Sequence, residues 1–131
     1  MNPSSQTPSS RADQLSQSGV DGLAAGDWTG AAQFFREAIA AEHGYVEAHH
    51  GLIRALCDGE RFEDAVAAAL ELTALTPNDP LAHTSLSIAL QKAGKIPEAE
   101  AAAGRARILE WKQQLAADPT EGSITELEPP R

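Results

Sequence analysis

The chain has 131 residues and a formal net charge of −9 at pH 7, with 42% hydrophobic, 22% charged and only 5% aromatic residues. This length predicts one domain, and the composition is typical of a globular protein. The acidic balance argues against general binding to nucleic acids or to anionic membranes. Alanine is the commonest residue type and has the highest helix propensity, so we expect an all-α fold.

Several kinds of site and segment find no support in the sequence. One cysteine cannot form an internal disulfide bond, and no cysteine cluster is available to hold zinc. No apolar stretch reaches the roughly 20 residues that a membrane helix needs. The first residues lack the basic and apolar regions of a signal peptide. We therefore expect a cytoplasmic protein that does not insert into a membrane.

The two ends of the chain differ in composition from its middle. Residues 1–11 are mostly polar residues and prolines, and residues 118–131 hold three prolines and four acids. Both segments are predicted to be disordered tails. Asp118 and Pro119 are expected to end the last helix. The folded domain is predicted over 12–117.

Six helices are predicted between the tails. Gly26, Gly59 and Gly94 are expected to follow the first helix of each pair as C-terminal caps. Asp79 is expected to cap the fifth helix, with Pro80 in its first turn. Apolar residues at helical spacing give the ranges 12–25, 29–42, 46–58, 62–75, 80–93 and 97–117.

One pattern recurs along the chain with a fixed period. Ala31, Ala65 and Ala99 occupy the same place in three similar stretches, 34 residues apart both times. A 34-residue period made of two helices is typical of a helix–turn–helix solenoid.

With these repeats the chain resembles the tetratricopeptide repeat (TPR) family. The resemblance covers three units, at 12–45, 46–79 and 80–113, and implies a right-handed α-solenoid of helix–turn–helix units. The residues that match the family pattern are Leu15, Gly19, Gly26, Trp28, Ala31, Phe35 and Ala38 in the first unit, Leu52, Leu56, Phe62, Ala65 and Pro77 in the second, and Leu86, Ser87, Leu90, Gly94, Ala99 and Ala106 in the third.

Two departures from the family pattern carry structural predictions. Ala69 is small where Phe35 is large, and a larger Leu72 compensates, so the core volume of the second unit is roughly kept. Trp111 stands where the family has a proline, so the last helix should run on to about residue 117 as a cap. Ile108, Trp111 and Leu115 share one helix face, and we expect this face to cover the open end of the solenoid.

The resemblance also implies a concave groove lined by the first helix of each unit. Arg54 is the only cation near its middle, which favours a partner segment with apolar anchors and one acidic contact. The groove residues implied are Asp13, Ser16, Val20, Leu23 and Ala24 in the first unit, Glu47, His50, Arg54, Cys57 and Asp58 in the second, and Leu81, Thr84, Ile88, Gln91 and Lys92 in the third.

Some family members grip an acidic chaperone tail with a clamp of basic and amide side chains. Binding a carboxylate requires such fixed donors. The matching positions here hold neither, which excludes a clamp of this type. Those positions are Ser16, Val20, Gly51, Leu81 and Ser85.

No set of residues predicts catalysis, a cofactor or a metal site. His49 and His83 lie at the bulky position between units and are expected to pack inside the stack, while His50 faces the groove. A zinc site would need three or four converging ligands. Cys57 is near the C-terminal end of its helix, where the helix dipole does not lower a thiol pKa. We therefore predict no enzyme activity, no cofactor and no metal.

The predicted function is a non-catalytic protein–protein interaction module, such as an adaptor, an assembly factor or a small subunit of a complex. One alternative is a chaperone, similar to the secretion chaperones of bacteria, that holds an apolar client segment. A second alternative is a self-assembling scaffold. The first two units carry net charges of −4 and −5 and the third +2, which leaves head-to-tail association of copies open.

Overall fold

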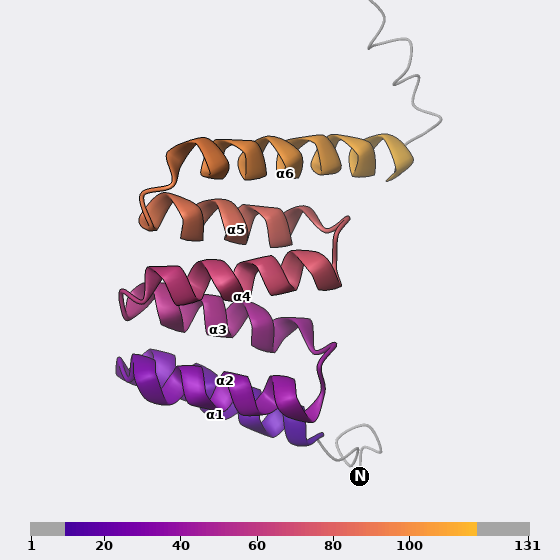
Figure 1. Cartoon of the computed structure of the whole chain (residues 1–131). Helices are drawn as coiled ribbons and strands as arrows, with labels where there is room; N and C mark the ends of the chain where they lie inside the picture. The colour runs from indigo at the N-terminus through magenta and orange to yellow at the C-terminus, as the bar shows by residue number, and fades with distance from the viewer. Residues whose placement is uncertain (1–9, 118–131) are drawn as a thin grey trace, which may run out of the picture.

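The computed structural model describes residues 10–117, which form six helices and no strand (Figure 1). The residues before Ser10 and after Ala117, predicted as tails, lie outside this description. The helices are α1 (Arg11–Ala25), α2 (Trp28–Ala41), α3 (Val46–Asp58), α4 (Phe62–Leu75), α5 (Pro80–Lys92) and α6 (Ile96–Ala117).

These bounds confirm the six predicted helices to within one residue. α1 begins at Arg11, one residue earlier than predicted, because Ser10 caps it. The Ser10 hydroxyl accepts a hydrogen bond from the Asp13 backbone, and the Asp13 carboxylate accepts one from the Ser10 backbone. This reciprocal pair satisfies two donors that a helix start leaves without partners. Asp79 caps α5 as predicted, accepting from the Leu81 backbone at 3.0 Å.

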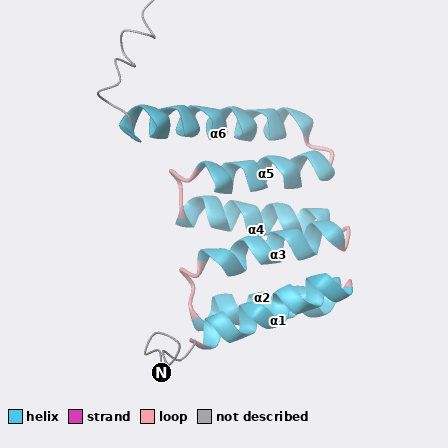
Figure 2. Cartoon of the chain, turned by 180° about the vertical axis from the view of Figure 1, so that it is seen from behind, coloured by secondary structure: helices cyan, strands magenta, loops and turns pink. Residues whose placement is uncertain are grey.

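The helices form an α-solenoid of three units. Each helix packs against the next one along the chain, and α3 also contacts both α1 and α5. Figure 2 shows from behind how the connections alternate between the two edges of the stack. The first helices of the units therefore lie in one row, which is the row that the predicted groove requires.

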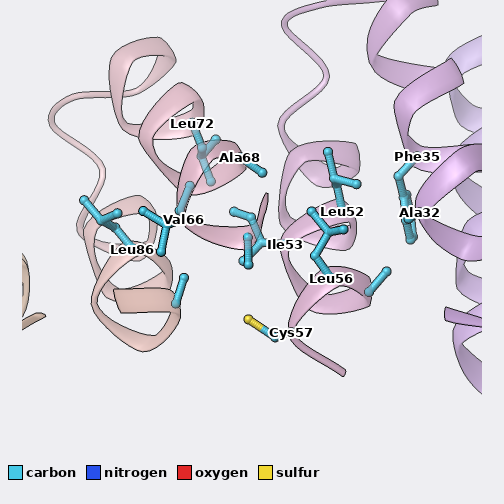
Figure 3. Close-up of a cluster of buried hydrophobic side chains, with 14 of the residues drawn as sticks. Ala32, Phe35, Leu52, Ile53, Leu56, Cys57, Val66, Ala68, Leu72 and Leu86 are labelled. Atoms are coloured by element: carbon cyan, nitrogen blue, oxygen red, sulfur yellow. The ribbon is translucent and has the colours of Figure 1, made fainter. Parts of the chain in front are cut away.

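The core between the first two units is built around Phe35 of α2 (Figure 3). Its side chain is 1% exposed. A Cβ atom on Gly19 would lie 2.6 Å from Cζ of this ring, and a Cβ atom on Gly51 would overlap it. The ring thus fits only because α1 and α3 both present a glycine to it. In the second unit Ala69 and Leu72 are both fully buried, as the predicted exchange of volumes requires.

The turn inside each unit contains one left-handed residue. Gly26 and Gly94 have φ angles of 77° and 82°, as their predicted capping role requires. Gly59 caps the end of α3 as predicted, but its φ is −85° and it is not left-handed. Glu60 adopts the left-handed conformation instead, with φ 62°. The backbone therefore follows the repeat position and not the glycine, which lies one residue too early in the second unit.

Two histidines close the turns between units. The Nε2 of His49 donates to the carbonyl oxygen of His43 at 2.7 Å, and the Nε2 of His83 donates to that of Pro77 at 2.8 Å. Both histidines occupy the same repeat position. His49 is 1% exposed, which confirms the predicted packing role, and His83 is half-buried.

α6 runs to Ala117, as the missing proline predicts, but the face assigned to the cap is wrong. Ala102, Ala106 and Leu109 are its buried residues in this part, while Ile108 and Trp111 are 50% and 49% exposed. A terminal helix has a neighbour on one side only. The alanine side packs against α5, because small side chains allow the closest approach, and the larger apolar side chains are left on the outside.

Candidate functional site

A pocket of about 430 Å³ lies across the first helices of the three units. α3 is central to it and supplies most of the lining, and α1 and α5 contribute from either side. The lining residues are Leu23 of α1, His50, Gly51, Ile53, Arg54, Cys57 and Asp58 of α3, and Ser85, Ile88 and Lys92 of α5.

The apolar part of the pocket has a buried floor and a more open wall. Ile53 and Cys57 are almost fully buried, and in Figure 3 their side chains point from α3 toward the next unit. Leu23 is half-buried, and Ile88 is 46% exposed. An apolar side chain of a ligand placed here would displace water mainly from Leu23 and Ile88.

The thiol of Cys57 contributes to this apolar part. Burial raises the pKa of Cys57, the positive charge of Lys92 opposes this effect, and the negative charge of Asp58 adds to it. The group therefore stays a neutral thiol near pH 7. A neutral buried thiol behaves as a small hydrophobic side chain and lacks the reactivity of a thiolate.

His50 connects the walls of the pocket. Its Nδ1 lies 3.2 Å from the hydroxyl oxygen of Ser85, which links α3 to α5. Burial lowers the pKa of His50, and the negative charge of Asp79 opposes this effect only in part. The imidazole is therefore uncharged at neutral pH, so the positive charge of the pocket comes from its lysine and arginine.

Two cations stand at the rim of the pocket. The Nε of Arg54 donates to the Oδ2 of Asp58 at 3.2 Å, one helical turn away, and the arginine side chain is exposed. An exposed pair of this kind adds little stability, so its groups can exchange partners. Lys92 makes no ion pair within residues 10–117. Arg54, predicted to be the only cation near the middle of the groove, shares the pocket with this lysine.

Seven of the fifteen predicted groove residues line this pocket: Leu23, His50, Arg54, Cys57, Asp58, Ile88 and Lys92. Ser16 is buried, so it is not available to a partner. Gln91 lines a separate depression between α5 and α6. The remaining predicted groove residues lie on the first helices outside both depressions: Asp13, Val20, Ala24, Glu47, Leu81 and Thr84.

Three lining residues lie outside the predicted groove set. Gly51 packs against the ring of Phe35, and sequence spacing gives no sign that it also lines the pocket. Ile53 is mainly a core residue, and no spacing rule separates that role from pocket lining. The lining residues beyond the predicted set are Gly51, Ile53 and Ser85.

Two further features are absent between Ser10 and Ala117. No group of three or more histidine, cysteine, aspartate or glutamate side chains is placed to hold a metal ion in that part of the chain. No helix there is both long enough and apolar enough to cross a membrane.

Comparison with protein families identifies the repeats. A sequence model of the tetratricopeptide repeat matches residues 22–87, half of the chain. The chain belongs to the tetratricopeptide repeat family. A comparison with curated proteins finds no matching sequence.

Solved TPR structures share the fold of this chain at low sequence identity. A crystal structure of MamA matches with a TM-score of 0.73 and 20% identity, over 79% of this chain and 60% of that one. The type III secretion translocator chaperone SycD of Yersinia enterocolitica matches with a TM-score of 0.71 and 18% identity, over 92% and 85%. A CopN–Scc3 complex matches with a TM-score of 0.73 and 18% identity, over 94% and 72%. This TPR chain therefore spans less than two thirds of the MamA chain.

Proposed function

We propose that this chain binds a segment of a partner protein in the pocket across α1, α3 and α5, and that it carries out no catalysis of its own. TPR folds serve as protein–protein interaction modules, and the family and the solenoid support that role here. The role would be that of an adaptor, an assembly factor or a small subunit of a complex. The pocket itself carries the proposal.

The shape of the pocket indicates what it would bind. Its volume of about 430 Å³ is in the range of small ligand sites, roughly 300–1,000 Å³. Such a space takes one or two apolar side chains of a helical or extended segment. The open apolar surface of Leu23 and Ile88 would receive these anchors.

The charges indicate what should flank the anchors. Arg54 and Lys92 stand beside the apolar surface, and Asp58 is the only acid in the lining. A segment with a carboxylate next to its anchor could displace Asp58 from Arg54 and also reach Lys92. Such complementarity affects orientation and association rate more than affinity.

The chaperone alternative has one specific observation in its favour. SycD, named as a secretion translocator chaperone, shares the solenoid over nearly the whole of both chains. A chaperone of this kind would keep an apolar client soluble, so a client that aggregates alone and stays soluble on co-expression would favour it. A self-assembling scaffold would instead show a mass that rises with concentration.

We also propose that this chain is located in the cytoplasm. Cys57 is a buried free thiol, which suits a reducing compartment. Cell fractionation tests this part separately from the pocket.

A displayed library of random peptides tests the pocket directly, because the selection itself supplies the ligands. Peptides selected on the wild-type chain would be measured by fluorescence anisotropy against Ile88→Asp and against Leu70→Asp. Leu70 is a matched control, because it is 52% exposed on α4 against 46% for Ile88, and it lies outside the pocket lining. We expect Ile88→Asp to weaken binding about tenfold or more, as for an anchor contact, and Leu70→Asp to leave binding unchanged.

The single cysteine gives an independent readout of occupancy. Because Cys57 lines the pocket and is the only cysteine, a bound peptide should slow its reaction with a maleimide. Arg54→Glu should weaken the binding of peptides that carry an acidic residue next to the apolar anchor. Peptides that bind Ile88→Asp and wild type equally, without slowing Cys57 modification, would move the binding site away from this pocket.

A further inference from the structure

The outer face of α6 carries large apolar side chains that the rest of the solenoid leaves uncovered. We define it as Ile108, Trp111 and Leu115. Ile108 and Trp111 are 50% and 49% exposed, and Leu115 is half-buried. With 3.6 residues per turn these three side chains form one stripe, on the opposite side of the helix from the residues that pack against α5. Large exposed apolar side chains that gather in one place mark contact sites.

Cations border this stripe on both sides. By helical spacing Arg107 lies along one edge, and Arg105 and Lys112 lie along the other. None of the three forms an ion pair with an acid between Ser10 and Ala117. Arg105 and Lys112 also line a shallow pocket of about 380 Å³ beside the stripe, together with Asn78 from the turn before α5.

This charge pattern indicates which kind of partner could cover the stripe. A second copy that packed its own α6 against this one would bring Arg105, Arg107 and Lys112 close to the same three cations, and Glu110 beside Arg107 would offset this repulsion only in part. Like charges in such a contact are unfavourable. The occupant should instead combine apolar side chains with several carboxylates.

The chain itself contains such a segment next to the face. Residues 118–131 carry four acids and one arginine, a net charge of −3, and include Ile124 and Leu127. We propose that this segment docks on the outer face of α6 of the same molecule. Its carboxylates would lie between the cationic edges, and Ile124 and Leu127 would cover Ile108 and Trp111.

The lengths allow this contact. Trp111 lies six residues before Ala117, which is roughly 9 Å along the helix axis. The seven residues from 118 to 124 reach up to about 23 Å when extended. Pro119 disfavours continuation of α6, so the chain can turn back along it. Because the segment is tethered beside its site, its effective concentration there is in the millimolar range.

Fluorescence of Trp111 tests the contact in the full chain. The chain has two tryptophans, so Trp28→Phe leaves Trp111 as the only reporter. In this background Ile124→Ser with Leu127→Ser should raise acrylamide quenching of Trp111 by roughly twofold, because a covered ring regains its contact with water. Ser123→Ala with Thr125→Ala, in the same segment, is the matched control and should change nothing.

A charge exchange tests the electrostatic part. Arg107→Glu with Lys112→Glu should increase quenching of Trp111, and adding Glu126→Lys with Glu128→Lys should restore the protection. Such a rescue measures a direct coupling between the two sites. High salt should weaken the protection of the wild type, because the Debye length is only about 3 Å at 1 M.

Two results would overturn the proposal. Equal quenching in the wild type and in the Ile124→Ser, Leu127→Ser variant would show that the segment does not cover Trp111. Protection that appears only as sedimentation shows a rising mass would assign the face to a second copy instead. Protection at a monomer mass, lost in that variant, is the expected result.

Discussion

The close contact between Gly19 and Phe35 makes Gly19→Ala a sharp test of the packing between units. The added Cβ would lie 2.6 Å from the ring, well inside ordinary contact distance. The ring cannot move away, because the backbone of Gly51 stands against it as well. Overpacking of this kind costs about 1–3 kcal/mol, and alanine recovers about 1 kcal/mol of helix propensity. We therefore expect a net loss of up to about 2 kcal/mol.

Gly104→Ala is the matched control for this substitution. Gly104 also lies inside a helix, but the nearest atom to an added Cβ is Nη2 of Arg107, at 3.7 Å. Here only the helix propensity changes, so we expect the free energy of unfolding to rise by roughly 0.5–1 kcal/mol. The two glycine-to-alanine changes should thus shift stability in opposite directions.

Urea denaturation followed by circular dichroism measures both variants against the wild type. For a chain of this size, 1 kcal/mol corresponds to about 3–6 °C in Tm, so thermal melting gives a second reading. Adding Phe35→Leu to Gly19→Ala should recover part of the loss, because the smaller side chain makes room. If Gly19→Ala stabilises the chain as much as Gly104→Ala does, the proposed ring contact does not limit the packing.

Three further predictions concern single hydrogen bonds and one backbone angle. The hydrogen bond to Asp13 raises the pKa of Tyr45 well above its usual value of about 10. The stability that this raised pKa contributes is fully present below pH 10, and it is lost as the pH rises through the pKa of Tyr45 in the folded state. Because Tyr45 is the only tyrosine, tyrosinate absorbance follows it directly, and Asp13→Asn should lower its pKa. Glu60→Gly should raise the free energy of unfolding, measured in urea, by about 0.5–1 kcal/mol, because glycine adopts the left-handed conformation without strain. Gly94→Glu should lower it. If both substitutions destabilise the chain, Glu60 is not strained. Ser87→Ala should cost about 0.5–1.5 kcal/mol in the same assay, because the hydroxyl donates to a carbonyl of α6 at 2.7 Å.

The helices and their order could be predicted because their signals are local. Apolar spacing and helix breakers act within one or two helical turns, and the 34-residue period and the family pattern add how the helices pair and how the units stack. The second turn shows where such reasoning stops. Gly59 caps α3 as predicted, yet the left-handed angle falls on Glu60, at the repeat position that Gly26 and Gly94 hold in the other units.

The candidate site was less predictable, because a pocket depends on what neighbouring helices leave uncovered. The repeat positions of Arg54, Ile88 and Lys92 placed them on the groove, and all three line the pocket. Ser16 has a position that suits the groove, yet it is buried. On α6 the stripe through Trp111 was recognised correctly as one face, but the sequence does not say which of two opposite faces a terminal helix turns inward.

The neighbour-to-neighbour packing of the helices also affects how the chain folds as it is synthesised. The substantial contacts join helices adjacent in sequence or, for α1, α3 and α5, one position further along, and local contacts of this kind favour rapid folding. Domains fold as they emerge, beginning at the N-terminus. The pair α1 and α2 can therefore form while α5 is still inside the ribosome. Because the pocket needs Ile88 and Lys92, it cannot be complete before α5 has been synthesised, later than the folding of the first unit.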